Sequence, residues 1–119
     1  MHLTEDDLGV IADDLEKHYD KGVRKALREI PPDDGRERST KDIIQVLGDS
    51  ANIAMALYVL RPAINDFLES SAQTSLSVAD KVTALRQHLY DTYVRPAKSH
   101  SARAQAIIEA ILKYLALKS

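Results

Sequence analysis

Apolar residues recur at intervals of three and four over the first 30 residues, which is the spacing of one helical face. The pattern includes Leu8, Ile11, Leu15, Val23 and Leu27. Thr4, followed three residues later by Asp7, is typical of an N-terminal capping box. The prolines and glycine of residues 31–35 disfavour further helix. The sequence therefore predicts one long first helix that ends before Pro31.

A second apolar pattern follows Ser39 and Thr40, either of which can cap a helix. Residues 51–60 are apolar except for Asn52, so this helix is expected to be buried on more than one side. Asn52 is interpreted either as a polar residue that pairs with itself across a symmetric interface or as one satisfied or exposed within the monomer. Pro62 either kinks the helix or starts a short third one over residues 63–68.

The last third of the chain predicts two further helices. Ser75 or Ser77 caps the first of them, whose apolar stripe runs from residue 78 to 93 and ends at Arg95 and Pro96. Ser99 or Ser101 caps the second, in which twelve of the sixteen residues 102–117 are apolar. No segment alternates as a strand does. Residues 1–119 are therefore expected to form a single all-α domain, a four- to five-helix bundle that is mostly antiparallel with a long first helix.

Two of these helices carry more apolar surface than a small bundle can cover with one core face. That surplus favours a homodimer or a dedicated protein partner over a monomer with one central helix. The residues expected to form this interface are Ile53, Leu57, Leu60, Ile107, Ile111 and Leu115.

Composition excludes several kinds of chemistry. The chain has no cysteine, so disulfides, thiolate nucleophiles and cysteine-based metal sites are excluded. Its four histidines lie in separate segments and its four glycines are isolated, so we expect no metal and no cofactor. No stretch approaches the roughly 18 apolar residues of a membrane span. We therefore expect a cytoplasmic protein without a membrane partner.

The net charge of −2 hides a segregation along the chain. Residues 1–20 hold seven acids and one lysine, whereas residues 21–41 hold seven bases and four acids. Such blocks can pair within one fold, or the basic run can contact an acidic partner surface such as residues 1–20 of a second copy. The residues expected to make such electrostatic contacts are Arg24, Arg28, Arg36 and Arg38.

Arg95 is followed five positions later by His100, just before the last predicted helix. This spacing resembles the Arg-x4-His motif of HEPN-type ribonuclease domains, and the resemblance implies that both residues act on an RNA phosphodiester. Pro96 departs from the polar residue usual in that family. The other interpretation is a helix-breaking loop with a basic surface. The sequence pI near 6.1 does not favour nucleic-acid binding.

Taken together, these patterns favour a non-enzymatic protein-interaction or regulatory module that self-associates through apolar helix faces. The alternative is a HEPN-like RNA-binding or ribonuclease domain that uses Arg95 and His100. The sequence assigns no other catalytic residue.

Overall fold

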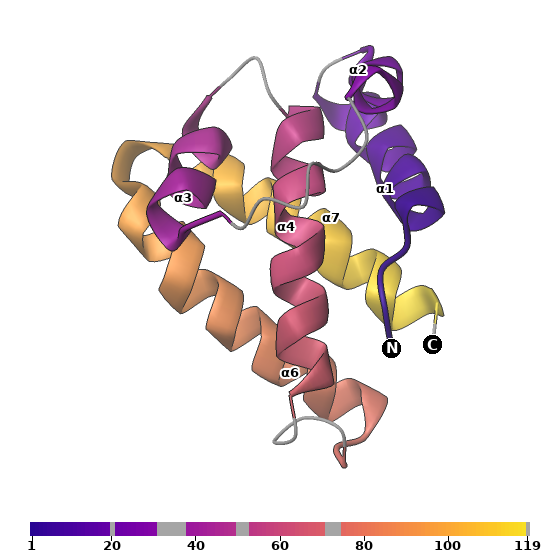
Figure 1. Ribbon diagram of the computed structural model, residues 1–119, viewed down its shortest axis with the longest axis vertical. Coiled ribbons are helices and arrows are strands. Elements are labelled where there is room, and N and C mark those ends of the chain that lie inside the picture. The colour runs from indigo at the N-terminus through magenta and orange to yellow at the C-terminus, as the bar shows by residue number, and fades with distance from the viewer. Residues whose placement is uncertain (20, 31–37, 50–52, 71–74, 119) are drawn as a thin grey trace.

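The computed structural model describes residues 1–19, 21–30, 38–49, 53–70 and 75–118, and every regular element among them is helical (Figure 1). This confirms the predicted all-α helical bundle. None of the described helices is long and apolar enough to cross a membrane. The elements are α1 (Glu5–His18), α2 (Val23–Glu29), α3 (Thr40–Gly48), α4 (Ile53–Glu69), α6 (Val78–Leu89), the π-helix η1 (Tyr90–Val94), the 3₁₀ segment η2 (Arg95–His100) and α7 (Ser101–Lys118).

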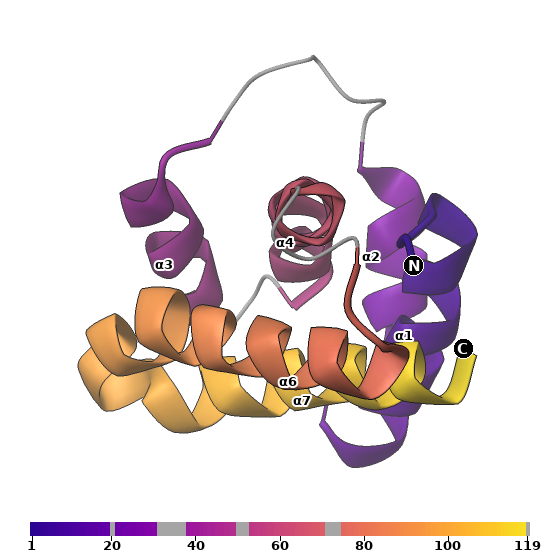
Figure 2. The same ribbon diagram turned by 90° about the horizontal axis from the view of Figure 1, so that it is seen from below.

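Helix α4 is the centre of the fold. Seen end-on, it lies above the α6–α7 pair, with α3 on one side and α1 and α2 on the other (Figure 2), and it contacts all five of these helices. Leu57, Leu60 and Ile64 are completely buried. The helix runs through Pro62 without ending there, so no separate third helix forms. Burial on both sides of Pro62 outweighs the one backbone hydrogen bond that proline removes.

The predicted long first helix is divided into α1 and α2. Gly22 adopts φ +92°, a left-handed conformation that glycine tolerates and other residues rarely adopt. The chain therefore turns at this point, and α2 packs back against α1. The apolar spacing continues across the turn, because both helices direct their apolar faces towards the same core.

The predicted second helix is also divided. Helix α3 ends at Gly48, and Asp49 follows it in an extended conformation. Ser39 is confirmed as the cap of α3, because its hydroxyl accepts the Asp42 N–H at 3.2 Å. The predicted turn at residues 31–35, Arg36 and Asn52 all lie outside the described residues.

Helices α6 and α7 form an antiparallel pair joined by a nearly continuous helical turn. Ser77 is confirmed as the cap of α6. The sequence predicts that this helix ends at Arg95 and Pro96; in the structure, helical backbone runs on through η1 and the first residues of η2 and breaks at Lys98, after which the chain turns back into α7. Ser101 is the first residue of α7 and Ser99 lies within η2, so neither residue holds the predicted position directly before the helix.

Two polar contacts fix the N-terminal segment against the bundle. Asn65, which is buried in α4, accepts the Leu3 N–H at 2.8 Å and donates to the Leu3 carbonyl at 2.9 Å. Asp7 completes the predicted capping box with Thr4 and accepts from Lys118 Nζ at 2.7 Å and from the Tyr114 hydroxyl. Burial raises the pKa of Asp7, but these hydrogen bonds outweigh it and hold the pKa well below its usual range.

Candidate protein-binding groove

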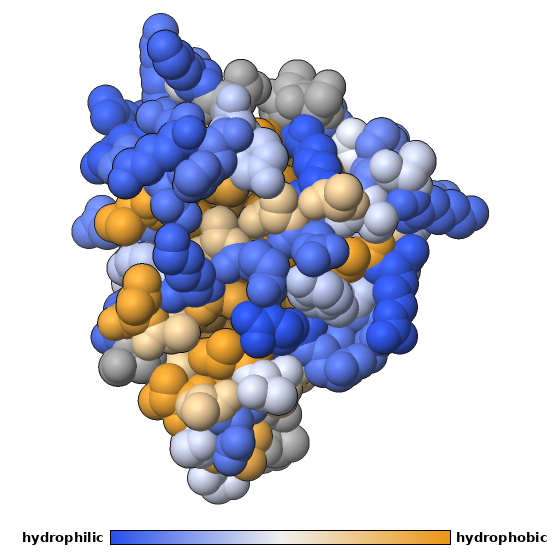
Figure 3. Space-filling view, turned by 180° about the vertical axis from the view of Figure 1, so that it is seen from behind, coloured by the Kyte–Doolittle hydropathy of each residue, from blue (hydrophilic) through white to orange (hydrophobic). Residues whose placement is uncertain are grey.

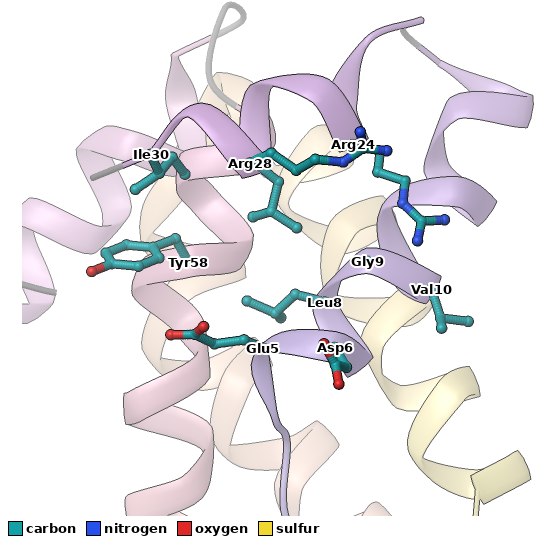
Figure 4. Close-up of a pocket in the computed structure, with 10 residues that line it drawn as sticks. Glu5, Asp6, Leu8, Gly9, Val10, Arg24, Arg28, Ile30 and Tyr58 are labelled. Atoms are coloured by element: carbon teal, nitrogen blue, oxygen red, sulfur yellow. The ribbon is translucent and has the colours of Figure 1, made fainter. Parts of the chain in front are cut away.

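A groove opens between α1, α2 and α4. It has a volume of about 730 Å³, which is within the range of ordinary ligand pockets. Its walls come from the first half of α1, from α2 and from one turn of α4 (Figure 4). The lining residues are Glu5, Asp6, Leu8, Gly9, Val10, Arg24, Leu27, Arg28, Ile30 and Tyr58.

The position of α2 creates this groove. After the turn at Gly22, the Arg24 N–H donates to Glu16 Oε1 at 2.8 Å, and the Arg24 guanidinium forms an ion pair with Asp13. Both contacts tie the beginning of α2 to the second half of α1. The Arg24 side chain packs over Gly9 in the first half of α1, and the space between Leu27, Arg28 and Ile30, the first turns of α1 and Tyr58 of α4 stays open. A hollow remains there.

The floor of the groove is apolar. Leu8 is buried beneath it, while Leu27, Ile30 and Tyr58 are half-buried and line the open space. Val10, at one edge, is 51% exposed. Half-buried apolar side chains around a hollow gain free energy when an apolar group excludes water from them. The floor can therefore bind an apolar group.

The rims of the groove carry opposite charges. Glu5 and Asp6, in the first turn of α1, lie at one end, and Arg24 and Arg28 lie at the other (Figure 4). Among the residues that the structure describes, no carboxylate lies within 4.0 Å of the Arg28 guanidinium, whereas Arg24 is already paired. The side chain of Glu5 is 77% exposed. Its Oε1 lies 3.8 Å from Arg61 Nη2, a long and therefore weak ion pair.

The structure brings three of the four predicted electrostatic residues to this groove. Arg24 and Arg28 line it. Arg38 lies next to it, with its guanidinium carbon 5.5 Å from the centre of the Tyr58 ring, a cation–π distance. Arg36 is the fourth and lies outside the described residues. Whether these side chains contact a partner stays a prediction.

The six residues predicted to form an interface lie elsewhere, in the core of the single chain. None of them is more than 8% exposed. The physical reason is that α4 is surrounded by the chain's own helices and α7 packs along the same core, so their wide apolar faces are covered without a second copy. A partner cannot reach these side chains unless the core opens. They are Ile53, Leu57, Leu60, Ile107, Ile111 and Leu115.

Arg95 and His100 lie on η2, and both are exposed. Arg95 is paired with Asp91 at 2.7 Å. The His100 ring packs against the end of α3, since a Cβ atom added to Gly48 would lie 3.1 Å from the ring. Within the described chain no hydrogen bond or ion pair joins the two residues. Lys98, between them, has φ +54° and ψ −111°, a strained backbone conformation for a residue other than glycine.

A second group of exposed apolar side chains lies at the start of α6 and the end of α7. It consists of Leu76, Val78 and Leu117. Apolar side chains gather towards the lower edge of the face seen from behind, among polar ones (Figure 3). Scattered exposed apolar side chains are normal on protein surfaces, whereas the groove combines apolar side chains with a hollow and charged rims. The groove is therefore the better candidate site.

Sequence reasoning did not find the groove because its residues come from three separate helices. Gly22 was one available signal, since an isolated glycine within a helical pattern can mark a turn. Among the described residues, no group of three or more histidines, aspartates and glutamates could hold a metal ion. Comparison with protein-family profiles, curated proteins and solved structures gave no match for this chain.

Proposed function

We propose that this chain is a cytoplasmic protein-interaction module whose groove between α1, α2 and α4 binds an apolar helical segment of a protein. The observation that carries this proposal is the set of half-buried apolar side chains, Leu27, Ile30 and Tyr58, that line an open hollow bordered by charge. Amphipathic helices bind other proteins by laying an apolar face into such grooves.

The chemistry of the lining agrees with this proposal. Tyrosine and arginine are enriched among the residues that contribute most binding energy at protein interfaces, and Tyr58, Arg24 and Arg28 line the groove. Arg38 packs over Tyr58 and extends the basic rim beyond the hollow. Charges at a rim affect the orientation and rate of encounter more than affinity. The groove would therefore bind by apolar contact and orient its partner by charge.

Selection from an unbiased library of displayed peptides tests the proposal. We expect the selected peptides to be amphipathic and to lose at least tenfold in affinity for the variant Val10→Glu, which places a charge at the groove edge. The matched control is Val78→Glu, because Val78 is similarly exposed but lies on α6. Circular dichroism checks that both variants fold. The proposal is wrong if no peptide is enriched, or if both variants bind the selected peptides equally well.

The second candidate is an RNA-directed function of Arg95 and His100. The observation that favours it is the strained backbone of Lys98 between them, since strained residues often occur at functional sites. Fluorescence anisotropy and cleavage assays with single-stranded RNA would compare Arg95→Ala and His100→Ala with the control Arg86→Ala. This candidate requires an RNA activity that the first two variants lose and the third retains. Lack of any RNA binding or cleavage in the wild type excludes it.

A further inference from the structure

We infer that the groove binds a second copy of this chain, in a two-fold symmetric dimer in which α2 of each copy lies against the groove of the other. This inference rests on the proposed function and names the partner. In a two-fold contact, if residue i of one copy meets residue j of the other, then j also meets i. A surface can therefore pair with itself only if its own features are complementary.

The order of features along the groove is self-complementary. One end is acidic, with Glu5 and Asp6, the middle is apolar, and the other end is basic, with Arg28 (Figure 4). A two-fold axis in the plane of contact, perpendicular to the line from the acidic to the basic end, places the acidic end of one copy over the basic end of the other, twice. Opposite charges then meet at both ends, and α2 of each copy faces the apolar hollow of the other. Such charge complementarity favours this orientation over others.

The rim charges have few partners among the residues that the structure describes. Among the described residues, no ion pair is formed by Arg28 or by Asp6, and Glu5 has only its distant contact with Arg61. Arg24, by contrast, pairs with Asp13 and is not needed for the dimer contact. Within the described parts of the chain, the rim side chains with no close ion pair are thus the two acids at one end of the groove and Arg28 at the other.

The shapes of the walls also allow this arrangement. Helix α2 borders the hollow at its basic end, where it carries Arg24 and Arg28 (Figure 4). With the two-fold axis beside this border, α2 of one copy lies in the hollow of the other and carries Arg28 towards Glu5 and Asp6 of that copy. Leu27 and Ile30, half-buried in the single chain, become covered from the open side. One contact thus covers the apolar floor and pairs the rim charges.

Charge reversal on the full chain tests this inference by sedimentation equilibrium at several concentrations. We expect the wild type to form dimers, and Arg28→Glu and Asp6→Lys each to raise the dimer dissociation constant at least tenfold. Mixing these two variants should give a heterodimer. One of its two contacts is the original pair of Arg28 and Asp6, and the other pairs the two reversed charges with each other. The controls Lys41→Glu and Asp66→Lys make the same charge changes at exposed positions outside the groove and should leave dimerisation unchanged. Circular dichroism confirms that each variant folds.

Three outcomes would overturn the inference. The wild type could be a monomer throughout, its dimer could survive both reversals, or the mixed variants could fail to associate. If peptides selected from the library still bind the groove in any of these cases, the proposed function stands and only the choice of partner is wrong. If peptide binding is absent as well, both proposals fail. Dimerisation that weakens in the two reversals, recovers in the mixture and is unchanged in the controls supports the inference.

Discussion

Asp7 provides the sharpest test of how the first turn of α1, which carries the acidic rim, is fixed. Its carboxylate accepts from the Thr4 N–H and from Lys118 Nζ, both at 2.7 Å, and from the Tyr114 hydroxyl. The residue is only 6% exposed. The variant Asp7→Asn keeps the shape of the side chain but removes its charge. It therefore isolates the contribution of the charged form.

We expect this substitution to lower the free energy of unfolding by about 2 kcal/mol, since a hydrogen bond to a charged group contributes roughly 1.5–3 kcal/mol and the amide retains part of the network. For a domain of this size the melting temperature falls by roughly 4 °C per kcal/mol, so Tm should fall by about 8 °C. Thermal unfolding at pH 7, followed by circular dichroism, measures it. Asp80→Asn is the matched control, because it removes the same charge from an exposed residue that lies, like Asp7, three positions after a helix cap.

The pH dependence gives an independent check. Hydrogen bonds hold the pKa of Asp7 below its usual range in the folded state, while the unfolded chain has the ordinary value of about 3.9. A lowered folded pKa means that the stabilisation is complete above about pH 5 and is lost as the pH falls through 3.9 towards the folded pKa. The difference in Tm between wild type and Asp7→Asn should therefore shrink over that window. An Asp7→Asn variant as stable as Asp80→Asn at pH 7, or a difference in Tm independent of pH, would refute this reasoning.

Three further substitutions test other parts of the fold. Leu57→Ala should lower the free energy of unfolding, measured in urea, by about 3 kcal/mol, because it leaves a cavity in the core. Light scattering should show an unchanged oligomeric mass, because Leu57 is completely buried within one chain. Gly22→Ala should lower the free energy of unfolding in urea by about 1 kcal/mol, since the φ of +92° at this position strains any residue with a Cβ atom. Lys98→Gly should raise Tm by a few degrees, because glycine relieves the strain at the φ of +54°. The greater entropy of glycine in the unfolded chain offsets about 1 kcal/mol of this gain. A fall in Tm would show that the strain is negligible.

Local chemistry made the helix starts predictable. Thr4, Ser39 and Ser77 each satisfy a free N–H in the first turn of the following helix, and that contact depends only on residues three positions apart. The apolar spacing likewise predicted the all-α class. The turns that divide the predicted long helices could not be predicted from apolar spacing, because an apolar stripe continues through a turn when the helices on both sides face the same core. Gly22 and the end of α3 at Gly48 are such places.

The strain at Lys98 and the groove could not be predicted in this way. Nothing in the residue type of Lys98 marks its positive φ, which lies inside η2 at the kink between α6 and α7. The groove requires Glu5, Arg28 and Tyr58 to meet from three helices, and that meeting depends on how the helices cross. The sequence did predict an electrostatic role for Arg24, Arg28 and Arg38, from charge segregation alone, and the structure brings these three to one surface.

The wide apolar faces that the sequence assigned to a partner interface lie instead in the core of the single chain. Helix α4 has helical neighbours on three sides: α3 on one flank, α1 and α2 on the other, and the α6–α7 pair beneath (Figure 2). This arrangement covers Leu57, Leu60 and Ile64 completely. Tyr58 of α4 stays half-exposed at the groove, where α1, α2 and α4 leave a hollow between them. What a partner would bury is thus not a wide helix face but the hollow between these three helices.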